Sequence, residues 1–361
     1  MKIFVSTGEV SGDLHLSYLV KEARELNKNV EFFGVAGKHS KSVGVNIIQD
    51  IDELAIMGFA EAIKKYSYLK KKAEEYLEFI KKENIKKVIM VDYGGFNLKF
   101  LELLKKEIKD IEVYYYIPPK LWIWGEKRID KLKLADHIMV IFPWEIDFYK
   151  KHGVEAIYYG NPFTERYQSI ERTGDKILLL PGSRKQEIKS LMPDFIELIR
   201  RNPEEKYLLK LSSKDHLKWI DEDVYIYKNL EISYDLSLNK GVKESKIAIA
   251  ASGTVTLELA LLGIPTIVVY KTSFINYFIA KYILKVGFVS LPNLTLNEEV
   301  FPELLQKKCT PDEIDKSIKT VLENLNSVQE KIQRIREKLS GVDITKKYAE
   351  FLLKGRDDGK N

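Results

Sequence analysis

The stretch that decides the fold is DKILLLPGSRKQEIKSL, from Asp175 to Leu191, near the middle of the chain. Four consecutive apolar residues, Ile177 to Leu180, have the composition of a buried strand. They stop at Pro-Gly-Ser-Arg, and a segment with helical spacing of apolar residues follows. A glycine lets the backbone approach an anion, and an arginine offers paired donors to it. The stretch therefore predicts an α/β protein that holds an anion in its second half.

Short apolar runs alternate with helical patterns on both sides of this stretch. Strands that lack in-and-out alternation and are separated by helices predict parallel sheets covered on both faces. We interpret the polar segment from Gly160 to Gly174 as a linker. The expected domains are residues 1–162, residues 175–310 and a set of C-terminal helices at 311–361. The expected strands are Lys2–Ser6, Val30–Val35, Lys87–Asp92, Ile111–Ile117, His137–Phe142, Ala156–Tyr159, Lys176–Leu180, Lys206–Leu211, Val224–Tyr227, Ile247–Ala250, Thr266–Tyr270 and Gly287–Ser290.

Composition narrows the function classes. The 361 residues are 45% apolar and 31% charged, as in globular proteins, and the net charge of +5 is too small to indicate nucleic acid by itself. The single cysteine, Cys309, excludes an internal disulfide framework and a cysteine-based zinc site. The first residues are typical of a strand rather than a signal peptide, so we expect a cytoplasmic protein.

The loops that follow two strands of the second half carry the residues expected to bind phosphate. One of them opens a helix, whose free amides and dipole favour an anion. Glu258 lies one helical turn after that opening and is placed to bind a ribose diol. No G-x-G-x-x-G or G-K-[ST] motif occurs, so we expect a diphosphate leaving group rather than a metal-bound triphosphate. The alternative is a pair of tight turns capped by Ser and Gly. The loop residues are Gly182, Ser183 and Arg184 in the first and Ser252, Gly253 and Thr254 in the second.

The strand-end loops of the first half are acidic. Asp92 follows the apolar run Val88–Val91 and precedes a Gly-Gly bend, and apolar surroundings favour a carboxylate that acts as a general base. The alternative is that Asp92 caps the next helix. Glu9 lies in a turn after the first strand, and Ser11 and Asp13 are interpreted as residues that start a helix.

A basic amphipathic segment follows Leu54. Apolar residues recur at helical spacing from Ile56 to Tyr66, and lysines crowd the remaining positions. This pattern is typical of a membrane-surface element, and the alternative is an ordinary surface helix in a lysine-rich chain.

Taken together, the sequence resembles the lipid-A-disaccharide synthases, glycosyltransferases of bacterial outer-membrane lipid synthesis. The motifs appear in order over most of the chain, which makes the resemblance far more specific than any single loop. They are GEVSGD from Gly8, LAIMGFAEA from Leu54, VD…FN from Val91, P…WIW…KR from Pro119, LLPGSR…EI from Leu179, ASGTVTLE from Ala251, VSLPNL from Val289, and ELLQ with Cys309.

The resemblance implies a GT-B fold, with two Rossmann-like domains that face each other across a cleft. It implies transfer of 2,3-diacylglucosamine from its UDP donor to 2,3-diacylglucosamine 1-phosphate, or lipid X. The products would be a β-1,6-linked disaccharide 1-phosphate and UDP. The reaction of such enzymes inverts the anomeric centre and needs neither metal nor cofactor.

The resemblance also assigns roles to residues. Asp92 matches the proposed general base, and Glu9 and Ser11 match acceptor-side residues needed for activity. Ser183 and Arg184 would stabilise the departing UDP. The remaining implied contacts are Glu258 with the ribose, Asn293 with the nucleotide, and the helix of Ile56–Tyr66 with the cytoplasmic surface of the inner membrane. The family forms dimers that exchange C-terminal segments, so residues from Pro311 onward are expected to pack on the first domain or on a partner.

The chain departs from the family pattern in its acceptor-side loops. The usual D-x-P-D-F-N has Gly94 and Gly95 here in place of Pro and the second Asp, and Asn161 replaces an expected His. Three other functions stay open: a UDP-N-acetylglucosamine 2-epimerase of the same fold, a transferase with a polyprenyl acceptor, and a non-catalytic sugar-binding protein. An epimerase would need no acyl-binding surface, so Ile56–Tyr66 packed in a core would favour it.

Overall fold

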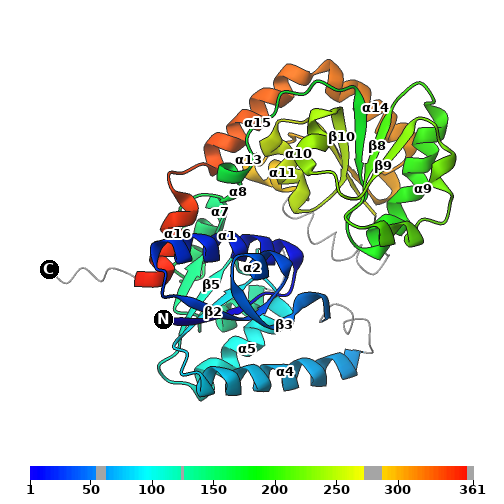
Figure 1. Ribbon diagram of the computed structural model, residues 1–361. Helices are drawn as coiled ribbons and strands as arrows, with labels where there is room; N and C mark the ends of the chain where they lie inside the picture. The colour runs from blue at the N-terminus through cyan, green and yellow to red at the C-terminus, as the bar shows by residue number, and fades with distance from the viewer. Residues whose placement is uncertain (54–61, 123–125, 272–286, 356–361) are drawn as a thin grey trace. The chain divides into compact units, whose positions relative to one another are not determined.

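The computed structural model describes residues 1–53, 62–122, 126–271 and 287–355. The chain divides into two compact units, Met1–Pro162 with Gly341–Asn361, and Phe163–Ser340. Each contains a six-stranded parallel sheet with helices on its faces (Figure 1). The predicted α/β class with parallel sheets is confirmed. Among the described helices, none combines the length and the apolar character that a membrane crossing requires.

The sheet of the first unit has the strand order β3-β2-β1-β4-β5-β6. Every neighbouring pair is parallel, so the carboxyl ends of all its strands lie along one edge. The strands are β1 (Lys2–Ser6), β2 (Glu31–Ala36), β3 (Val45–Asp50), β4 (Lys87–Val91), β5 (Glu112–Tyr116) and β6 (His137–Met139). The helices are α1 (Val10–Leu26), α2 (Lys38–Ser42), α4 (Ala62–Lys82), α5 (Gly94–Glu107), α6 (Ile129–Leu132), α7 (Pro143–Lys151) and α16 (Ile344–Lys354), with the 3-10 turn η1 (Glu126–Arg128).

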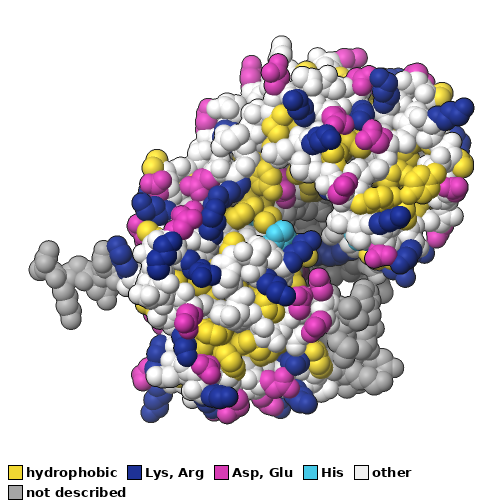
Figure 2. Space-filling model, in the orientation of Figure 1, with side chains coloured by type: hydrophobic (Ala, Val, Ile, Leu, Met, Phe, Trp, Pro, Cys, Tyr) yellow, Lys and Arg dark blue, Asp and Glu magenta, His cyan; other side chains and the backbone are white. Residues whose placement is uncertain are grey.

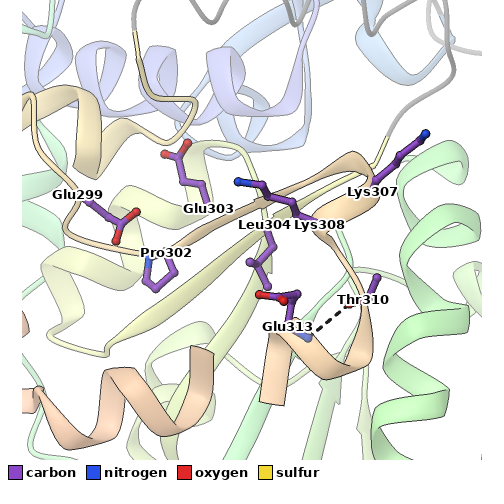
Figure 3. A pocket seen from close by; sticks show the side chains of 8 residues that line it. All are labelled: Glu299, Pro302, Glu303, Leu304, Lys307, Lys308, Thr310 and Glu313. Carbon is purple, nitrogen blue, oxygen red and sulfur yellow. Dashed lines mark hydrogen bonds between the residues drawn. The ribbon is translucent and has the colours of Figure 1, made fainter. Parts of the chain in front are cut away.

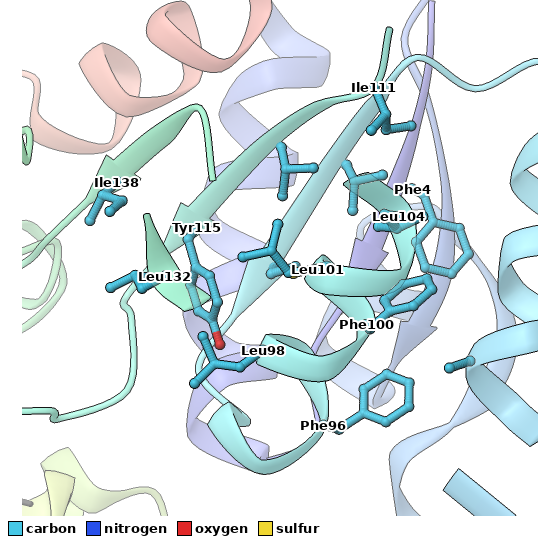
Figure 4. Packing of buried hydrophobic residues seen from close by; sticks show 14 of the residues in the cluster. Phe4, Phe96, Leu98, Phe100, Leu101, Leu104, Ile111, Tyr115, Leu132 and Ile138 are labelled. Carbon is cyan, nitrogen blue, oxygen red and sulfur yellow. The ribbon is translucent and has the colours of Figure 1, made fainter. Parts of the chain in front are cut away.

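The core of this unit forms where apolar strand residues meet one face of α5. Phe4, Phe100, Leu104 and Tyr115 are fully buried there, and the ring of Phe4 lies edge-on to that of Phe100 at 6.0 Å between centroids (Figure 4). On the other side, α16 packs against α1, so the last helix of the chain belongs to the first unit.

The sheet of the second unit has the order β12-β11-β10-β7-β8-β9, again parallel throughout. Its core places Leu180 and Ala250 of the central strands beneath Leu259 and Leu262 of α11. The strands are β7 (Lys176–Leu180), β8 (Tyr207–Lys210), β9 (Leu230–Ser233), β10 (Ser245–Ala251), β11 (Thr266–Tyr270) and β12 (Glu303–Leu305). The helices are α8 (Phe163–Arg166), α9 (Lys185–Arg201), α10 (Leu238–Lys243), α11 (Thr254–Leu262), α13 (Leu291–Leu296), α14 (Pro311–Glu323) and α15 (Leu325–Leu339), with the 3-10 turns η2 (Lys214–Trp219), η3 (Val224–Ile226) and η4 (Gln306–Lys308).

Three predicted strands are wrong, each for a local reason. Residues Val224–Ile226 form a 3-10 turn because the Asp223 carboxylate accepts a hydrogen bond from Tyr225 N (3.0 Å), which caps the turn. Residues 287–290 form no strand, since Val289 N and Ser290 N donate to the Glu303 carboxylate. The segment Ala156–Tyr159 contributes only one isolated bridge, between Met139 and Ile157.

Candidate functional site

The main chain at Asp92, directly after β4, is in the left-handed region, with φ 46°, and Tyr93 follows with φ 49°. Such backbone costs about 1–3 kcal/mol in a non-glycine residue and persists only where its surroundings hold it. Here Asp92 N donates to Ile117 O (3.1 Å), and the Asp92 carbonyl accepts from Tyr115 Oη (2.8 Å) and Asn97 Nδ2 (3.0 Å). The protein therefore holds a strained turn in place at the carboxyl edge of a central strand.

Asn97 joins this turn to the end of the neighbouring strand. Its side chain is fully buried, and its Oδ1 accepts from Ser6 Oγ (2.6 Å) while Nδ2 donates to Ser6 O (3.1 Å) as well as to Asp92 O. The N-cap of α5 is Tyr93, with no side-chain capping bond. The alternative interpretation of Asp92 as the cap of the next helix is therefore wrong.

The Tyr93 ring brings the β1–α1 loop against the β4–α5 loop. A Cβ on Gly8 would lie only 2.3 Å from this ring, so only glycine fits there. Burial, and then the charge of Glu9, raises the pKa of Tyr93, so the two side chains are close enough to interact. Glu9 is the N-cap residue of α1, and Ser11 lies in the first turn of that helix. The structure thus gathers the loops that carry all three predicted acceptor-side residues. The sequence pattern did not point to Tyr93.

Asp13 has a structural task beyond starting its own helix. It is buried, and its carboxylate accepts hydrogen bonds from the backbone amides of Gly37 (2.9 Å), His39 (2.9 Å) and Ser40 (3.3 Å). These amides open α2, so Asp13 fastens α2 to the start of α1.

In the second unit, Gly182 follows β7 with φ 99°, a conformation that favours glycine. The next two amides, of Ser183 and Arg184, donate to Glu187 Oε2 at 3.1 and 3.2 Å. Arg184 Nη1 also lies 3.3 Å from Glu187 Oε1. A carboxylate of α9 therefore already occupies the amides of this loop. The side chains of Ser183 and Arg184 are exposed, and that of Arg184 is paired with Glu187.

The loop after β10 has the predicted form. Gly253 is the N-cap of α11, and the helix begins at Thr254, after Ser252. Glu258 accepts a hydrogen bond from Tyr167 Oη (2.7 Å) on Oε2. Burial raises the pKa of Glu258, against the opposing effects of the Tyr167 bond and of Lys210. Tyr167 lies in the segment interpreted as a linker, and nothing in its sequence context marked it.

The hydrogen bonds of Asn293 are made within its own loop and not with the phosphate-loop residues. It is fully buried, its Nδ2 donates to Phe301 O (2.8 Å) and Glu303 Oε1 (2.9 Å), and its Oδ1 accepts from the amides of Val300 and Phe301 (both 2.9 Å). Both donors and both acceptors of the amide are engaged. As placed here, Asn293 holds its loop, and a nucleotide contact would require one of these bonds to break.

A pocket of about 490 Å³ opens along the edge strand β12 (Figure 3). None of the predicted site residues lines it, so it is separate from the phosphate loops. Its lining residues are Glu299, Pro302, Glu303, Leu304, Lys307, Lys308, Thr310 and Glu313.

The sequence also predicts a membrane-surface helix. Most of the segment Ile56–Tyr66 lies outside the described residues, and its side chains are not described. On the face drawn in Figure 2, basic and acidic side chains are interspersed.

In the part of the chain that the structure describes, no group of three or more His, Cys, Asp or Glu side chains could hold a metal ion.

Comparison with known proteins gives consistent results along the whole chain. The sequence model of the family described as Lipid-A-disaccharide synthetase matches residues 3–350. The lipid-A-disaccharide synthase of Nitrosococcus oceani is 31% identical and is covered to 98%, with 99% of this chain aligned. That of Synechocystis is 29% identical, with 98% of this chain and 97% of the relative covered.

Solved structures are similar in fold. The UDP-GlcNAc 2-epimerase of Methanocaldococcus jannaschii, solved in complex with UDP-GlcNAc and UDP, matches with TM-score 0.66 at 13% identity, covering 98% of this chain and all of the other. MurG of Acinetobacter baumannii matches with TM-score 0.58 at 12% identity, covering 98% and 99%. At these identities the likeness concerns the fold alone.

Proposed function

The chain belongs to the lipid-A-disaccharide synthetase family, and from that membership we propose the reaction that it catalyses. It is a glycosyltransferase with the GT-B fold. Its proposed donor is UDP-2,3-diacylglucosamine and its acceptor is 2,3-diacylglucosamine 1-phosphate. The products are the β-1,6-linked disaccharide 1-phosphate and UDP, formed with inversion and without metal.

The strained turn at Asp92 is the observation that supports this proposal best. Two consecutive left-handed residues that are not glycine are held by hydrogen bonds from the buried residues Tyr115 and Asn97. Strain of this kind concentrates at functional sites because the surrounding structure must maintain it. Glu9 reaches the same turn through Tyr93. The loops that carry Asp92 and Glu9 therefore meet at Tyr93, as an acceptor-activating site requires.

In the proposed mechanism Asp92 takes the proton from the acceptor 6-hydroxyl. The oxygen forms a bond to the anomeric carbon of the donor while the bond from that carbon to the UDP oxygen breaks. Ser183 and Arg184, whose side chains are exposed at the loop after β7, stabilise the charge on the departing diphosphate. The start of α11 offers amides and a helix dipole to the same group, and Glu258 binds the ribose.

Membrane contact and dimer formation belong to the same proposal. Both lipid substrates reside in a bilayer, and the described part of α4 carries exposed Lys70 and Lys71 that would be attracted to anionic lipid. We place the enzyme at the cytoplasmic surface of the inner membrane, as a homodimer. Vesicle co-sedimentation and light scattering test these two points separately from catalysis.

Replacing Asp92 with alanine tests the role of the base. Turnover of UDP-2,3-diacylglucosamine with the lipid acceptor should fall by about 10²–10⁴-fold, the range for a lost general base. UDP affinity, measured by calorimetry, should stay unchanged because UDP binds to the other unit. Asp110→Ala, at an exposed position of the same unit, is the matched control. Turnover in Asp92→Ala that equals the control would remove Asp92 from this role.

A further inference from the structure

The loop after β5 lies beside the Asp92 turn and contacts it at two points. Ile117 directly follows β5 with φ 54°, a conformation that is rare for a β-branched residue. Its carbonyl accepts the hydrogen bond from Asp92 N (3.1 Å). Two residues later, Pro119 packs so closely on Gly94 that a Cβ there would lie 2.4 Å from the proline ring. The loop that leads to Trp122 is therefore held against the segment that carries the proposed base.

Helix α7 supplies two further attachments of this loop. Tyr149 Oη donates to Pro119 O (3.5 Å), and Trp122 Nε1 donates to Glu145 Oε1 (3.3 Å). The rings of Trp122 and Trp144 also meet edge to face, at 6.1 Å between centroids and an angle of 88°. Trp122 is thus held in one orientation, yet the residue stays partly exposed.

Glu145 does more than cap α7. Phe142 N donates to its Oε2 (3.2 Å), which is the bond expected of a glutamate in the first turn of a helix. Glutamates are seldom fully buried, yet Glu145 is only 3% exposed, and burial raises its pKa to about 7. Burying a carboxylate is costly, and the cap uses only one of its oxygens. The other oxygen binds Trp122, which indicates that the orientation of this indole matters.

A partly exposed indole in a fixed orientation has a definite binding chemistry. Its one donor is already bonded to Glu145, so the ring presents an apolar surface rather than a hydrogen bond. The face of an aromatic ring is electron-rich and packs well against C–H groups such as those on one face of a sugar. A ring of this kind beside the Asp92 turn is suited to a sugar whose hydroxyl that acid deprotonates.

We propose that Trp122 is the platform on which the sugar ring of the acceptor lies, and that Glu145 is the positioning residue that orients its indole. This inference rests on the proposed function and deepens it, because it names the surface that binds the acceptor glucosamine beside Asp92. The acyl chains and the phosphate of the acceptor are bound by other groups.

The test is steady-state transfer from UDP-2,3-diacylglucosamine to 2,3-diacylglucosamine 1-phosphate in detergent micelles, with KM determined for each substrate. Trp122→Ala should raise the acceptor KM by about 10-fold and leave the donor KM unchanged, because the lost stacking contact is made with the acceptor alone. Trp219→Ala is the matched control, since Trp219 is also partly exposed but belongs to the second unit, and it should change neither KM. An unchanged acceptor KM in Trp122→Ala, equal rises for both substrates, or a loss confined to kcat would overturn the inference while the proposed function stood.

A double-mutant cycle tests the positioning role of Glu145. Glu145→Met removes the partner of the indole N–H and should raise the acceptor KM by about 3-fold, whereas Glu145→Gln keeps an accepting oxygen and should stay within about 2-fold of the wild type. In a Trp122→Phe background, which has no indole N–H, Glu145→Met should add no further effect. An equal effect in both backgrounds would mean that Glu145 only supports the fold, and its positioning role would fail.

Two remaining outcomes are also decisive. If Glu145→Met does not fold, Trp122→Phe gives the reading, since it keeps a ring but loses the bond to Glu145 and should itself raise the acceptor KM by about 3-fold; an unchanged value would overturn the role of the bond. If the wild type forms no disaccharide, the proposed function fails, and this inference fails with it.

Discussion

Replacing Asn97 with alanine removes the link between the ends of β1 and β4. The change deletes the bonds to Ser6 Oγ (2.6 Å), Ser6 O (3.1 Å) and Asp92 O (3.0 Å) in a fully buried position. At about 1 kcal/mol for each bond, with a further cost for the hydroxyl left unpaired, the first unit should lose about 2–4 kcal/mol of unfolding free energy. Asp92 O keeps its bond from Tyr115, so the turn should loosen rather than collapse.

The same variant should affect turnover. Loss of about 1 kcal/mol of restraint on the strained turn would lower the productive population, and with it turnover, by at most about 5-fold. Asn97→Asp keeps the volume but presents a carboxylate to the Ser6 and Asp92 carbonyls. It should therefore be less stable than Asn97→Ala at pH 7 and recover in acid, where a protonated Asp can donate one bond.

The unfolding of the first unit can be measured separately from that of the second unit by fluorescence. Three of the four tryptophans, at positions 122, 124 and 144, lie in that unit, and Trp219 lies in the other. In a Trp219→Phe background, urea unfolding followed by fluorescence reports on the first unit alone. Asn46→Ala is the control, because exposed Asn46 makes one bond to Phe32 O (3.1 Å). If Asn97→Ala costs no more than this control, the reasoning about the turn is refuted.

Three further predictions concern other buried groups. Asp13→Ala leaves three amides of α2 without their acceptor and should cost about 3 kcal/mol in the same urea assay; a cost below about 1 kcal/mol would contradict it. Burial raises the pKa of Glu145 to about 7 from an ordinary value of 4.5. The unfolded chain therefore releases this proton at a lower pH than the folded protein does. As pH rises from 4.5 to 7, the free energy of unfolding of the wild type should fall by roughly 3 kcal/mol relative to that of Glu145→Gln, with no further loss above pH 7. Parallel curves of stability against pH for the two proteins would refute this. A Cβ at Gly182 would lie 2.2 Å from Glu187 Oε2 at a φ of 99°, so Gly182→Ala should weaken UDP binding by about 10-fold or more in calorimetry, and unchanged affinity would show that this loop is not used.

Central strands of both sheets were predictable because consecutive apolar residues mark them in the sequence. The strands β1, β7 and β11 each contain at least three consecutive apolar residues, and the predicted bounds match the observed ones. The strands missed from the sequence, β3, β9 and β12, are all at sheet edges. Edge strands are partly exposed and tolerate polar residues, so their pattern is weak.

The candidate site was predictable as a set of loops but not as a set of contacts. The loops at strand ends pointed to Asp92 and, one helical turn into the following helix, to Glu258, since polar groups near that edge lie where parallel sheets bind ligands. The left-handed backbone at Asp92 and Tyr93 has no glycine to indicate it. The contact of Tyr167 with Glu258 joins residues 91 positions apart, and it follows from tertiary packing that local sequence does not encode.

The most direct test of the account is product analysis with purified protein, UDP-2,3-diacylglucosamine and 2,3-diacylglucosamine 1-phosphate in the presence of a chelator. The account predicts UDP release in step with a β-1,6-linked disaccharide 1-phosphate, with the linkage read by NMR. Absence of that disaccharide, a requirement for added divalent ion, or epimerisation of UDP-N-acetylglucosamine in its place would contradict it.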